Sequence, residues 1–490
     1  MSAENPLGLR PFQLADVNHV ELQAGALFAH QPGLGKTFMA GDRDRRLRAV
    51  PSSAGKPTLI VCPKALLYTW GEFYANNLPH VRLAVLDPTN SRTRQPWINA
   101  LVGQTADVFV IHYEGLKLPQ VWEHVAHRDF LHLIVDEAHR ISNRKSKTSI
   151  HVRALKATYR TALTGTPANR AVDQLWAILN FLDRQTWTSY WKYRRRYVEV
   201  EESYAGGTTY TKVVGPNSLT LPELQTRLKP FVVRRRKEDV LTELPPKQYR
   251  NVWVDLSAKQ RRVYDQMEKD MIAWIGEQED RPLVASVVIA RLIRLQQIAL
   301  ATPDFDEDGQ IILSCPSSKI DACLDLIRER KEAGEQVIVF SQFSRIIDLL
   351  CNQITAMGDV EYGKYTGGTR ATTRTQIEKG FLSGEIDVFA GTIGAGGTGL
   401  NLQTASEVIF LDRAWLPGEN LQAEDRIHRI GQRNASVTIT DIMARHTVDK
   451  GRHQHIRRNW RQVQRMLGDR HFDWSHSIED PEEDDVLATF

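Results

Sequence analysis

The stretch that most constrains this chain is a glycine-rich loop, Gly33-Leu34-Gly35-Lys36-Thr37, between an apolar run and a polar-faced segment. Glycines let backbone N–H groups close on phosphate oxygens, and the helix expected after the loop presents its positive N-terminus to the same anion. Lys36 can reach the β- and γ-phosphates of a nucleotide, and the Thr37 hydroxyl can hold Mg²⁺. The longer pattern G-x-x-x-x-G-K-[ST] requires glycine where this chain has His30, so the match is to the shorter core. Alone, such a loop also fits an ordinary turn before a helix.

Two carboxylates follow a predicted buried strand further along the chain. Residues 131–135 form an apolar run that ends in Asp136-Glu137-Ala138-His139. Ligands of open α/β sheets gather at the carboxyl ends of the strands. Asp136 is therefore placed to hold Mg²⁺ opposite Thr37, and Glu137 to orient and deprotonate an attacking water. The alternative is an acidic loop that caps the next helix.

Apolar runs of strand length alternate with helical segments through the first part of the chain, at 58–62, 81–86, 107–112, 131–135 and 159–163. This alternation predicts a doubly wound parallel sheet. A second unit of the same plan starts near Cys315, with runs at 336–340, 386–390 and 407–411 and a glycine-dense loop at 391–401. The predicted fold class is α/β, with two doubly wound parallel-sheet lobes, helical protrusions and a basic C-terminal segment.

The sequence divides into four predicted parts. The first lobe covers 1–243 and carries an insertion near 183–220, whose interleaved aromatic and basic residues suit nucleic acid as well as a solvated helix face. A linker and a helical protrusion occupy 244–314, and the second lobe covers 315–450. Residues 451–490 form a basic segment followed by an acidic tail.

Composition excludes several classes of protein. Among the 490 residues no apolar stretch approaches the roughly 20 needed to span a bilayer, and the N-terminus lacks the apolar run of a signal peptide. We therefore expect a cytosol-like compartment. The four cysteines form no C-x-x-C pair, which favours reduced structural thiols over zinc. A net charge of +4 permits nucleic-acid binding without demonstrating it.

These motifs, in this order, resemble helicase superfamily two, and within it the SWI/SNF-type DNA-dependent ATPases, in a compact form without accessory modules. The resemblance runs from about residue 9 to residue 450. It rests on the glycine-rich loop, the Asp136 to His139 box (a DEAH box) and residues 163–167, 339–343, 394–402 and 422–432. The last segment, which ends in Arg429-Ile430-Gly431-Gln432, is the most specific. Relatives usually carry an acidic residue and a methionine where this chain has His30-Gln31-Pro32.

The resemblance implies two RecA-like lobes with ATP and Mg²⁺ in the cleft between them, and it assigns roles to individual residues. From chemistry alone, Gln13 suits an adenine edge or a helix cap equally. The implied catalytic residues are Lys36, Asp136, Glu137, Arg426 and Arg429, and the implied Mg²⁺ ligands are Thr37 and Asp136. The implied nucleotide-binding residues are Gln13, Gly33, Leu34, Gly35, Lys36, Thr37, Gly397 and Gln432. The implied DNA contacts are Lys64, Tyr113, Ser341, Gln342, Thr366, Thr392 and Trp415.

The predicted function is that of an ATP-dependent double-stranded DNA translocase or remodeller that hydrolyses ATP on binding DNA, without obligatory strand separation. Two alternatives stay open: a strand-separating DNA or RNA helicase, and a motor-shaped nucleic-acid binding or recruitment protein with little turnover. The expected partners are double-stranded DNA and an unidentified protein cargo, with no membrane and a monomer as the default. The expected location is the cytoplasm of a bacterial or virus-infected cell, or the nucleus if the source is eukaryotic.

Overall fold

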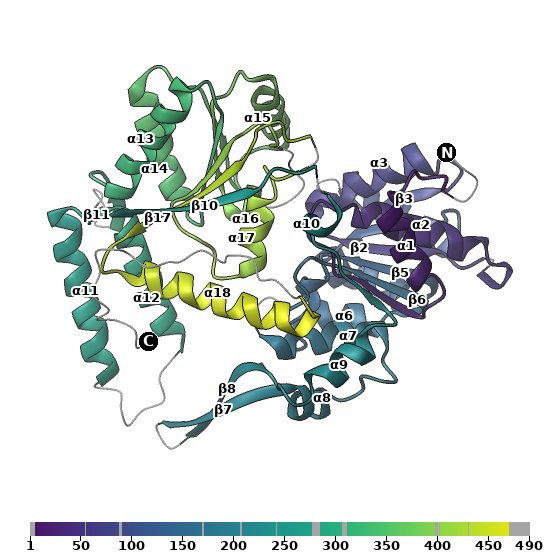
Figure 1. Ribbon diagram of the computed structural model, residues 1–490. Helices are drawn as coiled ribbons and strands as arrows, with labels where there is room; N and C mark the ends of the chain where they lie inside the picture. The colour runs from purple at the N-terminus through teal and green to yellow at the C-terminus, as the bar shows by residue number, and fades with distance from the viewer. Residues whose placement is uncertain are drawn as a thin grey trace. The chain divides into compact units, whose positions relative to one another are not determined.

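The computed structural model describes residues 5–53, 55–87, 91–168, 171–205, 208–241, 243–276, 285–305, 311–396, 400, 402–429 and 431–469. The chain divides into two compact units, whose helices and strands are labelled in Figure 1. Unit 1 comprises Met1–Val200, Val213–Thr242 and Gln462–Arg470. Unit 2 comprises Glu201–Lys212, Glu243–Arg461 and His471–Phe490.

Unit 1 is built on a seven-stranded sheet with the order β3-β4-β2-β5-β6-β1-β9, in which all neighbouring strands run parallel. The prediction of a doubly wound parallel sheet is confirmed for this unit. The strands are β1 (Gly25–Phe28), β2 (Thr58–Cys62), β3 (Leu83–Val85), β4 (Val108–His112), β5 (Asp129–Asp136), β6 (Lys156–Leu163) and β9 (Val232–Val233).

Successive side chains of a strand point to opposite faces, so a continuous apolar strand makes both faces of the sheet apolar. Helices cover both faces of a parallel sheet for this reason. Phe28, Ile60 and Ile134 pack on one face with Val17 of α1 and Trp70 of α3. Trp70 is fully buried. The helices are α1 (Pro11–Val20), α2 (Lys36–Ala49), α3 (Leu67–Asn77), α4 (Arg94–Gly103), α5 (Pro119–Val125), α6 (Lys147–Ala154), α7 (Leu175–Leu182), α8 (Tyr190–Tyr197), α9 (Leu221–Leu228) and α10 (Lys237–Val240).

Replacing Gly41 of α2 with alanine is expected to destabilise unit 1. A methyl group at this position would overlap the ring of Phe73, which is only 5% exposed. Overpacking costs about 1–3 kcal/mol, whereas removing glycine from a helix gains only about 1 kcal/mol. Hydrogen exchange of the α2 amides measures the change. The matched control is Gly71→Ala in α3, where the methyl would meet only Val85 at 4.0 Å and is expected to be neutral or stabilising. Equal protection in the two variants would contradict the prediction.

The predicted insertion near 183–220 contains α8 and a two-stranded sheet of β7 (Val198–Ala205) and β8 (Thr208–Pro216). Several aromatic side chains at its base pack against one another. The ring centroids of Trp187 and Tyr193 lie 5.9 Å apart, and those of Tyr193 and Tyr197 lie 5.4 Å apart. Gly206 and Gly207 lie outside the described residues.

Unit 2 is built on a six-stranded parallel sheet with the order β10-β17-β16-β13-β15-β14. The second predicted parallel-sheet lobe is therefore confirmed. One of its edge strands, β10, comes from the segment expected to be a linker, and it pairs along its whole length with β17. The strands are β10 (Lys247–Val254), β13 (Val337–Ser341), β14 (Tyr362–Tyr365), β15 (Val388–Thr392), β16 (Glu407–Phe410) and β17 (Val437–Ala444).

The helices after Glu243 include the two that form the predicted protrusion, α11 and α12. Tyr264 and Leu295 form part of a small core between them, and Met267 packs against it. The helices are α11 (Ala258–Gly276), α12 (Ala285–Leu300), α13 (Ser318–Glu332), α14 (Ser344–Met357), α15 (Ala371–Ser383), α16 (Ile393–Gly396), α17 (Pro417–Glu424) and α18 (Val448–Leu467), with a hairpin of β11 (Thr302–Phe305) and β12 (Ile311–Ser314). None of the helices described here is long and apolar enough to cross a membrane. The predicted acidic tail lies outside the described residues.

Candidate functional site

The predicted motifs of unit 1 meet at the carboxyl edge of its sheet, because all the strands of this sheet run in the same direction. The glycine-rich loop follows β1, the Asp136-Glu137 pair ends β5, and Thr164 follows β6. Thr164 and His139 are brought together, with His139 Nδ1 3.4 Å from Thr164 Oγ1. Strand ends of this kind form the ligand sites of open α/β sheets.

The glycine-rich loop places a lysine at the first turn of α2. Gly33 and Gly35 have φ values of 85° and 75°, which favour glycine, and a side chain at Gly35 would also overlap the Gln13 amide. Lys36 Nζ donates to the carbonyl oxygens of His30 at 2.9 Å and Gln31 at 3.3 Å. The ammonium group is thus held by the backbone that enters the loop.

Gln13 braces this loop from α1. Its Oε1 accepts a hydrogen bond from the backbone N–H of Arg10 at 2.8 Å, which caps the helix. Its Nε2 donates to the carbonyl oxygen of Leu34 at 3.0 Å, and the residue is 9% exposed. The side chain therefore caps α1 and holds the loop at the same time, and its contact with adenine stays a prediction.

His30 takes part in a buried cluster that the sequence did not predict. Its Nε2 lies 2.9 Å from Asp16 Oδ2, and the Arg235 guanidinium donates to both oxygens of the same carboxylate. Burial opposes ionisation of Asp16, but His30 and Arg235 outweigh it and hold the pKa of Asp16 below its ordinary value. Burial also lowers the pKa of His30, so a neutral imidazole donates to the carboxylate. Asp16 and Arg235 are 219 residues apart, and no local pattern links them.

Asp136 is a buried carboxylate with two protein donors. The Trp70 indole donates to Oδ2 at 3.0 Å, and the backbone N–H of Glu137 donates to Oδ1 at 2.9 Å. Burial, followed by the neighbouring Glu137 charge, raises the pKa of Asp136 to about 6, and the Lys36 charge acts in the opposite direction. The structure therefore brings Lys36 and the carboxylate pair into one electrostatic environment.

Glu137 adopts a backbone conformation that is rare for its residue type, with φ at 51°. Its Oε2 lies 3.2 Å from His139 Nδ1. Residues held in such regions cluster at functional sites, where the surrounding structure fixes an otherwise unfavourable geometry. Here Tyr113 contributes, because its hydroxyl donates to the carbonyl oxygen of Asp136 at 2.5 Å.

Tyr113 differs from its predicted place on a DNA track. Its ring is 1% exposed, and the Arg140 guanidinium lies 5.6 Å from the ring centroid. A phenol buried in this way supports the turn after β5 and has no surface to offer DNA. Lys64, the other predicted contact in unit 1, is exposed in a short 3-10 helix directly after β2.

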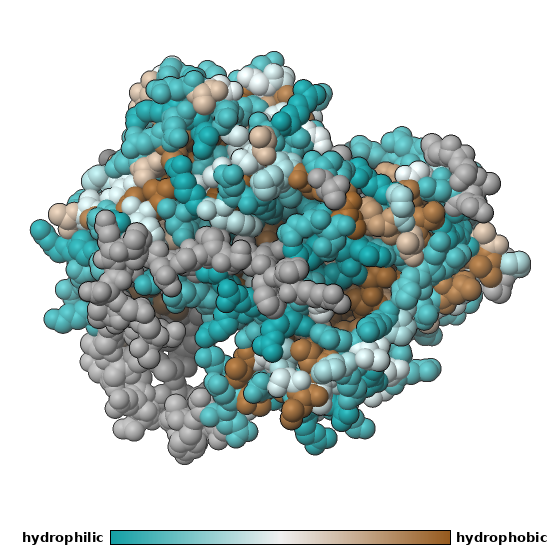
Figure 2. Space-filling model, in the orientation of Figure 1, coloured by the Kyte–Doolittle hydropathy of each residue, from teal (hydrophilic) through white to brown (hydrophobic). Residues whose placement is uncertain are grey.

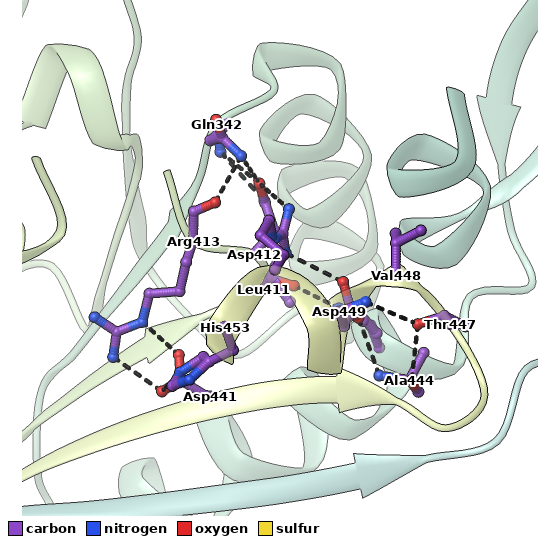
Figure 3. A network of polar contacts seen from close by, with 12 residues as sticks. Gln342, Leu411, Asp412, Arg413, Asp441, Ala444, Thr447, Val448, Asp449 and His453 are labelled. Atoms are coloured by element: carbon purple, nitrogen blue, oxygen red, sulfur yellow. Dashed lines mark hydrogen bonds and ion pairs between the residues drawn. The ribbon is translucent and has the colours of Figure 1, made fainter. Parts of the chain in front are cut away.

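In unit 2 the predicted residues Ser341 and Gln342 follow β13 and are both bound to Asp412. Ser341 Oγ donates to Asp412 Oδ1 at 2.5 Å, and Gln342 Nε2 donates to Oδ2 at 2.8 Å and to the carbonyl oxygen of Arg413 at 2.7 Å (Figure 3). Ser341 is fully buried and Gln342 is half-buried. Asp412 thus fixes the end of β13 against the end of β16.

Arg413 is the centre of a buried charge cluster. Its Nε and Nη2 donate to the two oxygens of Asp441 at 2.6 and 2.9 Å (Figure 3). Its Nη1 donates to Glu424 Oε1 at 2.6 Å. His453 of α18 lies beside the same carboxylate, with Nε2 3.2 Å from Asp441 Oδ2. Burial opposes ionisation, but Arg413 first and His453 second hold the pKa of Asp441 far below its ordinary value.

Arg426 and Arg429 do not lie on one helix face, because α17 ends at Glu424 and both arginines occupy the turns that follow. Arg426 is 4% exposed and donates to the carbonyl oxygens of Gln422 and Leu400. Arg429 Nε donates to the carbonyl oxygen of Asp425 at 2.9 Å.

The remaining predicted residues of unit 2 lie at strand ends and in the turns beyond them. The Gln432 side chain donates to two backbone carbonyls and accepts from two backbone N–H groups, so it braces its own turn. Thr366 is 8% exposed, and Thr392 and Trp415 are half-buried. Gly397 lies outside the described residues.

Two family models match the chain. The SNF2-related domain matches residues 16–302, and the helicase conserved C-terminal domain matches residues 318–431. The first match alone covers more than half of the chain. The predicted resemblance to the SWI/SNF-type ATPases is therefore confirmed.

Known proteins are similar over most of this chain. The ISWI chromatin-remodeling complex ATPase ISW1 of Saccharomyces cerevisiae is 31% identical over 87% of this chain and 38% of its own length. The mouse SWI/SNF-related matrix-associated actin-dependent regulator of chromatin subfamily A member 1 is 30% identical over 90% of this chain and 42% of its own length. A solved Sulfolobus solfataricus SWI2/SNF2 ATPase core in complex with dsDNA is 25% identical, covers 95% of this chain and 94% of its own, and superimposes with a TM-score of 0.43. The chain spans about two fifths of the length of these two curated relatives. With the SNF2-related model matched across 16–302 and the helicase C-terminal model beyond it, this chain belongs to the SNF2-related family.

Proposed function

We propose that this chain is an ATP-dependent double-stranded DNA translocase or remodeller, which hydrolyses ATP on binding DNA without obligatory strand separation. The observation that carries the proposal is that Lys36 and the Asp136-Glu137 pair lie at one edge of the sheet, close enough for the Lys36 charge to act on Asp136. The chain that carries them belongs to the SNF2-related family. Family membership supports nucleotide use in general, and the geometry of unit 1 supports hydrolysis at this edge.

Lys36 is assigned to the β- and γ-phosphates of ATP. Its ammonium group would exchange the carbonyl oxygens of His30 and Gln31 for phosphate oxygens, and the backbone N–H groups of the loop would close on the same anion. Gly33, Leu34, Gly35 and Thr37 belong to this cradle. Gln13 is assigned to the adenine side of the site, where its present bond to the Leu34 carbonyl already braces the loop.

Thr37 and Asp136 are assigned to Mg²⁺, and their chemistry fits that ion. A hydroxyl and a carboxylate are the oxygen ligands that Mg²⁺ takes, usually with water and phosphate oxygens. A cation beside Asp136 would also relieve the burial and like-charge repulsion that raise its pKa to about 6. Bound Mg²⁺ neutralises charge on the phosphates.

Glu137 is assigned to the attacking water. Its carboxylate would accept a proton from that water while the left-handed backbone and the His139 contact hold it in place. From unit 2, Arg426 and Arg429 are assigned to the γ-phosphate, with Gln432 and Gly397 as further nucleotide-side residues. A guanidinium can grip charge that is spread over several phosphate oxygens.

The proposed DNA contacts are Lys64, Gln342, Thr366, Thr392 and Trp415. Lys64 is the exposed cation among them, and Gln342 is positioned by Asp412. Contacts of this kind engage the backbone of DNA, which makes binding insensitive to sequence and sensitive to salt. Tyr113 is reassigned from DNA contact to support of the Asp136-Glu137 turn. Ser341 is fully buried and donates to Asp412, so it is reassigned from DNA contact to support of the turn after β13.

Steady-state ATP hydrolysis is expected to be stimulated strongly by duplex DNA and weakly by single-stranded DNA or RNA. The measurement compares no polymer with each of the three polymers, at low and moderate salt, and subtracts the rate of Lys36→Ala as the contaminant background. A triplex-displacement assay on duplex DNA then tests translocation.

The other outcomes of this experiment contradict the proposal in different ways. Stimulation mainly by single strands or RNA would replace it with a strand-separating helicase. Hydrolysis no faster than the Lys36→Ala background under all conditions would favour a binding or recruitment protein with little turnover.

A further inference from the structure

An arginine–aromatic patch on unit 1 lies outside the residues assigned above. We define it as Arg144, Arg184, Tyr190, Trp191 and Arg194, which come from the loop before α6, the segment before α8 and α8 itself. Figure 1 locates α6, α7 and α8 together, and Figure 2 shows hydrophobic residues set among hydrophilic ones over α8 and α9. All the patch residues except Arg144 belong to the insertion near 183–220, in which the sequence interleaves aromatic and basic residues.

Stacking orders the arginines of this patch. The Arg144 guanidinium lies 3.9 Å from the centroid of the Tyr190 ring and 5.6 Å from that of Trp191, and the Arg194 guanidinium lies 5.9 Å from Trp191. Trp191 is nevertheless 64% exposed. A guanidinium stacked on a ring keeps its N–H edge available for an anion, and its orientation is fixed before the anion arrives.

The arginines of the patch are not held in ion pairs with the described carboxylates. Within the described part of the chain, no ion pair joins Arg144, Arg184 or Arg194 to an acidic side chain. Two carboxylates close to the patch have neutral donors. Asp173 accepts from the Tyr190 hydroxyl at 2.6 Å. Asp183 accepts from the backbone N–H groups of Gln185 and Thr186.

Mutual repulsion among the arginines supports the same conclusion. Burial lowers the pKa of Arg153 in α6, and the charges of Arg184 and Arg144 lower it further. Arg153 stacks on Trp176 at 5.2 Å and donates to Asn180, so it is held beside the patch. Cations gathered on one surface attract a polyanion, and an exposed tryptophan among them can stack on a base.

We propose that the arginine–aromatic patch binds the phosphodiester backbone of nucleic acid, as a contact additional to those of the proposed DNA track. The proposal rests on the proposed function in that it takes nucleic acid as the polyanion. The arginines bind phosphates on single-stranded and duplex DNA alike, whereas Trp191 reaches only unpaired bases. The two kinds of strand therefore respond differently to substitutions in the patch.

The test is a fluorescence-anisotropy titration of the full chain with labelled duplex and single-stranded DNA at several salt concentrations. Arg144→Gln/Arg194→Gln is expected to weaken binding several-fold and to reduce the slope of log affinity against log salt, by about 1.8 for duplex or about 1.4 for single strands if two phosphate contacts are lost. The control Lys56→Gln/Lys156→Gln removes the same charge from two exposed lysines of unit 1 and is expected to leave the slope unchanged. Arg144→Lys/Arg194→Lys keeps the charge and is expected to restore the slope but not the full affinity.

Trp191→Ala distinguishes the two strand types. A loss confined to single-stranded DNA would place an unpaired base on Trp191, and no loss on either DNA would restrict the contact to phosphates. The proposal is overturned if Arg144→Gln/Arg194→Gln has the same affinity and salt slope as Lys56→Gln/Lys156→Gln on both DNAs, while circular dichroism shows that all variants are folded. If the wild-type chain bound neither DNA, the proposed function would be overturned as well. If only Arg144→Gln/Arg194→Gln showed no effect on binding, the proposed function would stand.

Discussion

Replacing Glu137 with glutamine is expected to lower the turnover number for ATP by about 10²–10⁴-fold, because the amide cannot take a proton from the attacking water. Nucleotide binding is expected to stay close to the wild-type value. Lys36 and the glycine-rich loop are untouched, and the side chain keeps its size in the left-handed turn. Duplex-stimulated hydrolysis measures turnover, and titration with a fluorescent ATP analogue measures binding.

Glu114→Gln is the matched control for this variant. Glu114 follows β4 on the same sheet edge, and its carboxylate lies 3.7 Å from Arg140 on an exposed part of the surface. We expect Glu114→Gln to hydrolyse ATP at the wild-type rate. If Glu137→Gln turned over ATP as fast as this control, the role of Glu137 in activating water would have to be withdrawn.

Replacing Arg413 with methionine is expected to destabilise unit 2 by about 3–5 kcal/mol, the usual cost of removing one partner from a buried ion pair. Asp441 and Glu424 would stay in the interior without the guanidinium that binds both. The stacking of Arg413 on Phe410, at 3.8 Å, would be lost as well. Hydrogen exchange of the β17 amides measures the opening free energy of this unit directly.

Arg445→Met is the control for the loss of charge. Arg445 pairs with Asp255, whose side chain is 73% exposed, so its removal is expected to cost less than about 1 kcal/mol. A similar loss of protection in the two variants would mean that the buried cluster around Arg413 contributes nothing particular to stability.

The same cluster makes the stability of unit 2 depend on pH. Burial opposes ionisation of Asp441, but Arg413 holds its pKa well below the unfolded value. The unfolded state then takes up a proton before the folded state does, so the opening free energy falls as the pH drops from about 5 toward 3. In Arg413→Met this decline is expected to be shallower.

Strands that are continuous apolar runs could be predicted from the sequence, whereas the polar edge strand β10 could not. Residues 58–62 are a continuous apolar run, and they form β2 at those bounds. The edge strand β10 reads Lys-Gln-Tyr-Arg-Asn-Val-Trp-Val, and it starts directly after Pro245-Pro246, a pair that reads as a linker. Only its pairing with β17 makes this stretch a strand.

The candidate site divides in a similar way. Lys36, Asp136 and Glu137 lie in short patterns whose residue types suit phosphate chemistry, so the sequence places them at one edge. The partners that orient these patterns are distant in sequence. Asp412 binds Gln342 from 70 residues away, and no spacing rule predicts that contact. Arg426 and Arg429 are assigned only through the family resemblance, and both lie in the turns after α17, which ends at Glu424.

The carbonyl oxygens of His30 and Gln31 accept hydrogen bonds from the Lys36 ammonium group, so they would compete with phosphate oxygens for that group. After phosphate release the ammonium group would donate to these two oxygens again, so its N–H groups would keep hydrogen-bond acceptors. Because Lys36 already has these two acceptors without phosphate, the net free energy gained when it binds phosphate would be smaller. With Lys36 in its proposed role, the nucleotide product would be released more readily than from a lysine that had only phosphate to bind, which suits repeated cycles of hydrolysis better than tight retention of product.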